Sequence, residues 1–328
     1  MKLRIGFNVW GQFATWDELI EAGRTIDGLG FDALWASDHF IPSIPKVDGA
    51  EQVVRGPMWE GWMLAAGWAA ATSRVTVGTL VSAAGYRSPA VMVKMASALD
   101  HLSGGRAVLG IGAGWFAAEH AMFGFELLEP AARFDRFEES VAVARLLLDA
   151  GPGTPVSHDG RHFTLRDAVN DPAPLQRRLP LMVAGEGERR TIPIVARYAD
   201  MWNVSGDPAT IAGKNRLLDE ACARAGRDPR AIRRTAHRRP ALIRPSRDEA
   251  IATLAESYAR HAIPWTRALE LADASPNVGT VEDVVTALAD VARAGFDEVS
   301  FELPLPYDRP TLEALAGPVR ERLAGFLA

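Results

Sequence analysis

Short apolar runs alternate with longer helix-like segments along almost the whole chain. Eight such runs stand out, and most of them are bounded by Gly, Asp or Asn. Uninterrupted apolar stretches of this length are typical of strands buried on both faces, as the strands of parallel sheets are. We therefore predict eight strands, which lie within residues 3–9, 32–37, 75–83, 106–114, 179–185, 200–205, 232–243 and 295–303.

A helix-like segment follows each predicted strand, and the clearest covers residues 133–151. Eight β/α units in one chain predict an α/β fold, a single (β/α)8 TIM barrel with insertions. A doubly wound sheet usually has fewer strands and a phosphate loop after the first one, but here the first strand ends in "NVWGQ". Thr15 is expected to precede the first helix, and Gly28 or Gly30 to follow it.

Two segments interrupt the repeat. Residues 151–178 contain several Pro and the stretch "HDGR", which predicts a hairpin plus a loop before the fifth strand. Residues 262–279 separate two helical stretches near the C-terminus. Insertions of this size are usually lids or packing arms. Because no linker divides the chain, residues 1–328 are expected to form one domain.

Composition and charge narrow the function classes. Of the 328 residues, 48% are hydrophobic and 23% are charged, which is typical of a globular protein. The net charge is −5 and no basic stripe is visible, which argues against nucleic acid as a partner. The single Cys222 has no partner for an internal disulfide or a Cys-based metal site, and the His residues show no metal-ligand spacing. Without a signal core or membrane span, the protein is expected in the cytoplasm.

Candidate chemistry is sought where strands end, because barrel active sites lie at the C-terminal ends of the strands. Asp38 and His39 end the second strand, and His is well suited to proton transfer near neutral pH. The alternative is a loop cap with an exposed His. Small residues 82–85 end the third strand, either as room for a flat ligand or as a simple turn.

The fourth and fifth strands end in glycine-rich segments. Glycines 110, 112 and 114 share one face of the fourth strand and allow close approach of a ligand. Glu119 and His120 follow one turn later, and His120 is equally interpretable as structural. The fifth strand runs into "VAGEGERRT", a turn with Arg189 and Arg190 that is the best candidate for a phosphate site. Trp202 and Asn203 end the sixth strand, where Trp202 is either at the rim or in the core.

Taken together, these segments resemble the luciferase-like monooxygenase superfamily of flavin and deazaflavin oxidoreductases. The resemblance is carried by "GFDALWASDHF", "VTVGTLVSAAGYRSPAVMVKMASALDHLSGGR", "LGIGAGWFAAEHAMFG", "RFDRFEE" and "LPLMVAGEGERRTIPIVARYADMWN". It covers nearly the whole chain to about residue 205, and the last β/α unit more loosely. "SDHF" and "GAGW" look like the branch that uses coenzyme F420, because FMN-using members often have an Arg where this chain has Ala113.

The resemblance implies a barrel that binds F420, or FMN, over its C-terminal mouth. It implies a non-prolyl cis peptide bond at Leu80–Val81 beside the cofactor ring. It also implies that His39 is the proton donor or acceptor, with Glu119 or His120 assisting. From the resemblance and the strand-end positions together, the residues expected to bind the cofactor are Asp38, His39, Leu80, Val81, Ser82, Gly112, Ala113, Gly114, Trp115, Ala184, Gly185, Glu186, Gly187 and Trp202.

The expected function is hydride transfer between F420 and a small organic substrate. The alternative is an FMN-dependent two-component monooxygenase that is fed by a separate reductase and inserts oxygen into a small organic substrate. A third class, a barrel that binds flavin without turnover, is disfavoured by a ring-side His and an open mouth. Trp10, Trp59, Trp62 and Trp265 suggest an apolar or aromatic substrate, although they are also interpretable as core residues. The resemblance further implies a homodimer, and neither a metal nor a membrane is expected.

Overall fold

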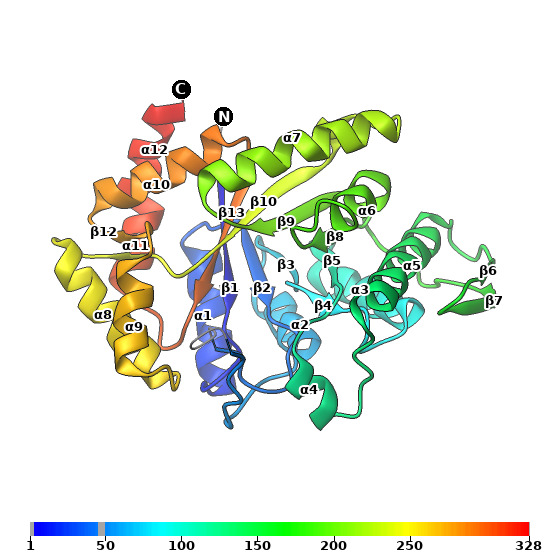
Figure 1. Cartoon of the computed structure of the whole chain (residues 1–328), viewed down its shortest axis with the longest axis horizontal. Coiled ribbons are helices and arrows are strands. Elements are labelled where there is room, and N and C mark those ends of the chain that lie inside the picture. The colour runs from blue at the N-terminus through cyan, green and yellow to red at the C-terminus, as the bar shows by residue number, and fades with distance from the viewer. Residues whose placement is uncertain (1–2, 45–49, 328) are drawn as a thin grey trace.

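The computed structural model describes residues 3–44 and 50–327 and shows a closed parallel barrel surrounded by helices (Figure 1). Eight strands form the barrel, in the spatial order β3, β2, β1, β13, β10, β9, β8 and β5, and β3 pairs with β5 to close it. The predicted (β/α)8 fold is therefore confirmed. The barrel strands are β1 (Arg4–Val9), β2 (Ala33–Ala36), β3 (Thr76–Thr79), β5 (Ala107–Gly112), β8 (Leu181–Ala184), β9 (Met201–Ser205), β10 (Arg233–Arg238) and β13 (Glu298–Leu303).

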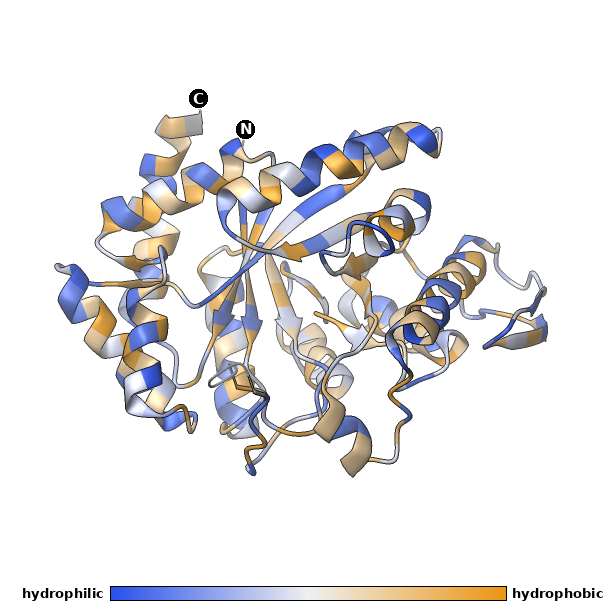
Figure 2. Cartoon of the chain, viewed as in Figure 1, coloured by the Kyte–Doolittle hydropathy of each residue, from blue (hydrophilic) through white to orange (hydrophobic). Residues whose placement is uncertain are grey.

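The helices pack around the barrel and turn one face towards it. Figure 2 shows hydrophilic and hydrophobic residues mixed along them, as amphipathic helices on a barrel require. Thr15 caps α1, as predicted, through a capping box with Glu18, and Gly30 follows the helix with a φ of 80°. The helices are α1 (Trp16–Gly28), α2 (Gly61–Ala71), α3 (Pro89–Ser103), α4 (Ala117–Met122), α5 (Pro130–Asp149), α6 (Thr191–Tyr198), α7 (Pro208–Arg224), α8 (Arg247–Arg260), α9 (Trp265–Asp273), α10 (Val281–Arg293), α11 (Arg309–Ala314) and α12 (Arg320–Leu327).

The inside of the barrel is filled by side chains and is not a pore. The Trp35 ring lies in its centre within a small apolar cluster that includes Val108 and Met182. Gly78 makes room for this ring, because a Cβ there would lie 3.3 Å from it. Above this apolar layer, five strands end in the inward-facing polar residues Asn8, Ser37, Asn203, His237 and Glu302, which line a cavity at the mouth. The barrel therefore changes from apolar to polar towards the carboxyl ends of its strands.

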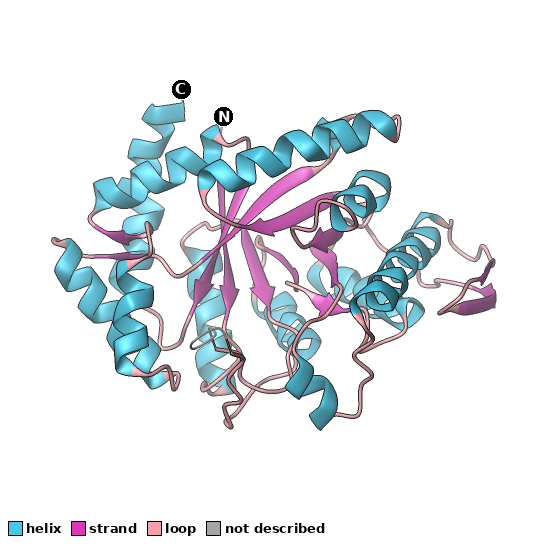
Figure 3. Ribbon diagram, in the orientation of Figure 1, coloured by secondary structure: helices cyan, strands magenta, loops and turns pink. Residues whose placement is uncertain are grey.

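The interruptions differ in part from the expectation. The first contains the predicted hairpin, formed by the antiparallel strands β6 (Val156–Asp159) and β7 (Thr164–Ala168), which projects beyond α5 (Figure 3). The second is largely ordered structure, since residues 262–279 contain α9 and β12 (Val278–Gly279). β12 pairs in parallel with β11 (Leu242–Ile243), the end of the predicted seventh run. Among the described residues, no helix is both long and apolar enough to cross a membrane.

Candidate active site

Two adjoining cavities open at the C-terminal mouth of the barrel. One has a volume of about 400 Å³ and lies over the strand ends, against β1, β9, β10 and β13. The other, of about 380 Å³, extends from the second and third strands to the turn after β8. We call the first the central cavity and the second the lateral cavity. Both are lined by His39, Leu80, Val81, Trp115 and Ala184, so the two cavities meet at these residues.

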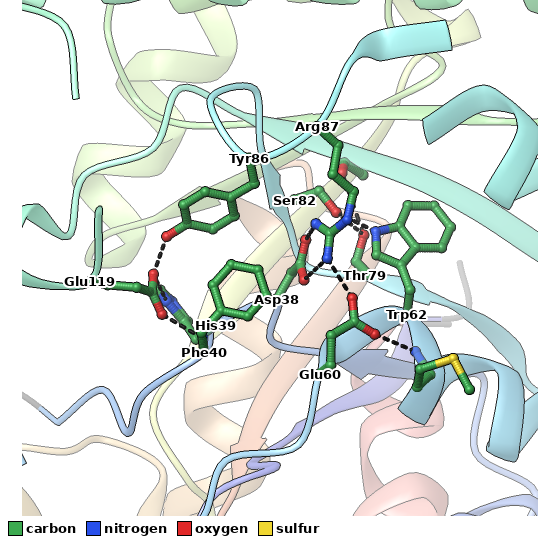
Figure 4. Close-up of polar contacts among 12 residues, drawn as sticks. Asp38, His39, Phe40, Glu60, Trp62, Thr79, Ser82, Tyr86, Arg87 and Glu119 are labelled. Carbon is green, nitrogen blue, oxygen red and sulfur yellow. Dashed lines mark hydrogen bonds and ion pairs between the residues drawn. The ribbon is translucent and has the colours of Figure 1, made fainter. Parts of the chain in front are cut away.

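His39 lies at this junction and is held by a buried carboxylate. Its Nδ1 lies 3.0 Å from an oxygen of Glu119, whose side chain is fully buried (Figure 4). The Tyr86 hydroxyl and the backbone N–H of Phe40 donate to the same carboxylate. The loop after β2 and helix α4 are thereby joined around one carboxyl group. Glu119 has no exposed surface for a ligand, so its place in the site is to orient His39.

Hydrogen bonds keep this carboxyl group ionised in spite of its burial. Burial alone raises the pKa of a carboxyl group, but hydrogen bonds from His39, Tyr86 and the Phe40 N–H more than offset it, and the pKa of Glu119 is lowered. The pKa of the Tyr86 hydroxyl is raised, first by burial and then by its hydrogen bond to Glu119. Tyr86 therefore stays neutral and donates its hydrogen. An ionised Glu119 accepts from Nδ1–H of His39, which leaves the lone pair on Nε2. Nε2 has no partner among the described residues, so it is free to exchange a proton in the cavity.

Asp38 has a different role from its neighbour. Its carboxylate is buried and accepts two hydrogen bonds from Arg87, at 2.6 and 3.2 Å. Arg87 also pairs with Glu60, the residue that caps the start of α2 (Figure 4). Asp38 borders the lateral cavity, but both of its oxygens are occupied. The Asp38–Arg87–Glu60 chain therefore fixes the loop that carries His39.

The third strand is interrupted at the predicted position. The Leu80–Val81 bond is cis, as expected, and both residues line both cavities. The chain then resumes as β4 (Ser82–Ala83), which pairs with β5. Ser82 was expected to contact the cofactor, but its side chain is fully buried and its hydroxyl accepts from the Trp62 indole. Ser82 therefore supports the wall from behind.

The far wall of the lateral cavity is built from the carboxyl ends of β5 and β8 and the segments that follow them. Gly112 permits close packing, because a Cβ there would lie 2.7 Å from Val81 Cγ2. Gly185 adopts a φ of 136°, a conformation that favours glycine. The expected cofactor residues here all border the cavity, namely Gly112, Ala113, Gly114, Trp115, Ala184, Gly185, Glu186 and Gly187.

The turn after β8 fits an anion, although not through its arginines. The backbone N–H groups of Glu186 and Gly187 have no hydrogen-bond partner among the described residues, and the turn leads into α6. Unpaired N–H groups before a helix are suited to a phosphate. Arg190 was expected to add a positive charge, but it pairs with Asp135 at 2.6 Å. Neither it nor Arg189 lines the cavity.

His120 and Trp202 do not reach either cavity. His120 is buried, and its Nδ1 lies 2.9 Å from the Phe116 carbonyl of its own helix, so the structural alternative describes its position. Trp202 is fully buried in the outer core against Phe296. Its indole donates to the Gly185 carbonyl at 2.9 Å, which helps to fix the turn after β8. The expectation that Trp202 itself lines the cofactor site is therefore wrong.

Several residues of the central cavity were not anticipated. His237 lies 3.1 Å from Glu302 on the neighbouring strand, and Arg239 and Tyr258 lie close by in the same wall. The only sequence signal for His237 and Glu302 is the alternation of side-chain direction along their strands. This alternation turns residues 235 and 237 of β10, and residues 300 and 302 of β13, to the same side. Trp10 lines this cavity together with Ser43 and Ile44 of the loop at residues 40–57, and residues 45–49 of that loop lie outside the described residues.

No group of three or more His, Cys, Asp or Glu able to hold a metal ion is found in residues 3–44 and 50–327. The two cavities instead fit a long flat cofactor with an anionic end. The lateral cavity runs from the His39 junction to the unpaired N–H groups in the turn after β8, and Gly112 and Gly114 lie along its wall. The central cavity leaves space for a second molecule on the other side of His39.

Comparison with known proteins agrees with this geometry. The chain is 28% identical over 307 residues to the phthiodiolone/phenolphthiodiolone dimycocerosates ketoreductase of Mycobacterium tuberculosis, covering 83% of this chain and 77% of the relative. It is 31% identical over 198 residues to the F420-dependent glucose-6-phosphate dehydrogenase of Amycolatopsis mediterranei, covering 60% of this chain and 54% of the relative. Both relatives are oxidoreductases, as the sequence led us to expect of this chain.

A solved structure shares the fold over the whole length. It is described as an F420-dependent secondary alcohol dehydrogenase in complex with an F420-acetone adduct. It matches with a TM-score of 0.77 and 20% identity, covering 98% of this chain and 99% of the other. A family model described as luciferase-like monooxygenase matches residues 5–299. The chain therefore belongs to the luciferase-like monooxygenase family.

Proposed function

We propose that this protein is an oxidoreductase that transfers a hydride between the deazaflavin coenzyme F420 and a small organic substrate. The observation that carries the proposal is the position of His39. Its ring lies where the two cavities meet, with Nδ1 fixed by Glu119 and Nε2 free. A proton-exchanging group is needed at this junction when a hydride passes between a cofactor on one side and a substrate on the other.

The cofactor choice is supported by sequence and by relatives. One relative, 31% identical, is named as F420-dependent, and Ala113 stands where FMN-using members often have an Arg. When bound, F420 supplies hydride chemistry and does not activate oxygen. We place it in the lateral cavity, with its phosphate at the N–H groups of Glu186 and Gly187. Leu80, Val81 and Trp115 would frame its ring.

The other roles in the proposed reaction fall to side chains of this protein. Glu119 and Tyr86 hold His39, whose Nε2 takes a proton from the substrate or returns one to it. Arg87 fixes Asp38 and with it the loop that presents His39. The Trp115 ring stands edge-on to His39 with ring centres 5.8 Å apart and forms part of the wall at the junction. The substrate occupies the central cavity.

The second candidate is an FMN-dependent monooxygenase that receives reduced flavin from a separate reductase. The name of the family favours it, because the matching model is described as a monooxygenase. The lateral cavity offers an anion the same N–H groups in either case. A cytoplasmic location and a homodimer also belong to the proposal, and the homodimer follows from the sequence resemblance alone.

A binding titration distinguishes the two candidates. Purified cofactor-free protein is titrated with oxidised F420 and, separately, with FMN, and binding is followed by fluorescence. Tight binding of F420 with weak binding of FMN is the expected result, and it directs the substrate search towards alcohols, ketones and imines. The reverse preference would make oxygen insertion the leading reaction and overturn the F420 assignment.

A further inference from the structure

A second histidine–carboxylate pair lies in the central cavity, away from His39. His237 on β10 and Glu302 on β13 both face the inside of the barrel, where these strands are neighbours. His237 Nε2 lies 3.1 Å from one oxygen of Glu302, and each side chain is about a fifth exposed, 21% and 23%. β1 and β13 separate β10 from β2, the strand that precedes His39. The two pairs therefore belong to different parts of the cavity wall.

The environment of His237 fixes which atoms face a ligand. Its Nδ1 is buried and has no hydrogen-bond partner among the described residues. A buried N–H without an acceptor is costly, so a neutral His237 carries its hydrogen on Nε2 and donates it to Glu302. Neither nitrogen is then free for a ligand, and His237 acts as a positioning residue.

Glu302 is left with one unused oxygen. Its second carboxylate oxygen has no partner in residues 3–44 and 50–327, and it is not among the enclosed atoms. Other carboxylates near the barrel are paired with arginine, as Glu298 of the same strand is with Arg4 at 3.0 Å. Within the described part of the chain, His237 is the only basic side chain that pairs with Glu302 within 4.0 Å. A carboxylate in this state is ready to accept a hydrogen bond from a bound molecule.

The rest of the central cavity carries both apolar and polar side chains. Trp10, Ile44, Met58 and the ring of Tyr258 form its apolar part, and Gln12, Ser43 and Arg239 line it as well. The apolar part accepts a hydrocarbon ring or a branched chain, whereas Glu302 offers one strong acceptor in the same cavity. A purely apolar substrate would cover this acceptor and leave it without a hydrogen bond, at a cost in affinity.

We propose that Glu302, oriented by His237, is the recognition carboxylate for a hydroxyl or ammonium group of the substrate. This inference rests on the proposed function, because it assigns the substrate class of the same site. The substrate carries the reacting alcohol or carbonyl group at His39 and a second hydrogen-bond donor at Glu302, as a diol or an amino alcohol does. Glu302 binds this donor and takes no part in the hydride or proton transfer.

The test compares ligands with and without the second donor. Cyclohexanol, trans-1,2-cyclohexanediol and trans-2-aminocyclohexanol are titrated against the cofactor-free full chain, and their dissociation constants are measured by saturation-transfer NMR. At least one of the two bifunctional ligands is expected to bind roughly tenfold more tightly than cyclohexanol. The comparison between them distinguishes a hydroxyl from an ammonium donor. Equal affinities for all three, or no binding of any, would overturn the inference.

Variants assign the effect to Glu302. Glu302→Gln should abolish the tenfold preference of the bifunctional ligands over cyclohexanol. His237→Leu should weaken the preference, and His237→Gln should restore part of it, because an amide N–H can still donate to Glu302. Glu298→Gln is the matched control: it is an inward-facing carboxyl group of the same strand that lies outside the cavity, and it should keep the preference. If Glu302→Gln still preferred the bifunctional ligands over cyclohexanol, the proposal would be contradicted.

A parallel F420 titration separates this inference from the proposed function. Glu302→Gln should bind F420 as the unmodified protein does, because Glu302 does not line the lateral cavity. If F420 fails to bind any form, the F420 assignment falls, and the NMR comparison remains readable because it uses no cofactor. If F420 binds but the ligand preference is absent, only the inference about Glu302 falls.

Discussion

Glu119 shows how a buried carboxylate keeps its charge in this protein. Its lowered pKa means that the folded state holds its proton less tightly than the unfolded chain, whose usual value is 4.5. The stability from its ionised form is therefore complete above about pH 4.5 and is lost as the pH falls through the lower folded value. Glu119 therefore stays ionised near neutral pH and continues to hold the His39 ring in place.

The first prediction concerns His39. His39→Ala should keep its affinity for the cofactor and lose most of its turnover, by a factor of about 10²–10⁴ for a group that transfers a proton. Cofactor affinity is measured by fluorescence titration, and turnover by the change in F420 absorbance with an accepted substrate. The reason is that Nε2 is the free ring nitrogen at the junction, whereas the cofactor wall is built mostly from other residues.

Glu119→Gln serves as the comparison for this variant. The amide can still accept from Nδ1–H of His39, so turnover should fall less than in His39→Ala. Unchanged turnover in His39→Ala would remove His39 from the mechanism. An equal loss in both variants, together with weaker cofactor binding, would mean that the pair only holds the loop.

Among the elements, α8 and α9 form an arm over the central cavity. They pack on each other and share an apolar cluster with Trp10 and Ile44, which is separate from the main core. Tyr258 of α8 belongs to this cluster and lines the cavity. In Figure 1 the two helices lie at the opposite side of the barrel from the β6–β7 hairpin. The arm therefore borders the central cavity, whereas no residue of α8 or α9 lines the lateral cavity.

This arrangement predicts the effect of loosening the arm. Leu271→Ala in α9 removes a buried side chain from the cluster and should lower the free energy of unfolding by about 2–5 kcal/mol. It should also weaken binding of cyclohexanol and leave F420 affinity unchanged. Leu288→Ala in α10 is the matched control, because it is equally buried but belongs to the main core. The control should lose a similar free energy of unfolding, measured by urea denaturation, and keep its affinities for cyclohexanol and F420. If both variants bound cyclohexanol equally weakly, the proposed role of the arm would be contradicted.

The elements also show how far the sequence determines the site. The sequence places all eight strands. Most of them are marked by apolar composition, as strands buried on both faces are, whereas β10, with the sequence RRTAHR, is placed by its position in the β/α repeat. His39 is found because it stands at a strand end, where barrel chemistry occurs. Glu302 is not found, because its strand is charged on one side and the sequence does not say which side faces the cavity. Trp202 is misplaced for the same reason, since one position along a strand separates the mouth from the outer core.

At the scale of the whole molecule, the first and last strands of the chain are neighbours in the barrel. β1 and β13 pair in parallel over six residues, from Arg4–Glu298 to Val9–Leu303. The main core cluster extends from Leu3 to Leu323 without a break into two groups. Neither half of the barrel can keep a closed sheet when the other half opens. The parallel strands depend on contacts far apart in the sequence, so their stability is shared.

Hydrogen exchange tests whether residues 1–328 behave as one domain. Amide protection measured by mass spectrometry should give similar opening free energies for β1, β5, β9 and β13, because opening any of them opens the barrel. The β6–β7 hairpin should exchange faster, since it forms a separate two-stranded sheet whose residues are largely exposed. Saturating F420 should raise the protection of the four strands together, by mass action on the folded state. Separate opening of the β1–β5 half and the β8–β13 half would show two cooperative units, and the assignment of a single domain would then be wrong.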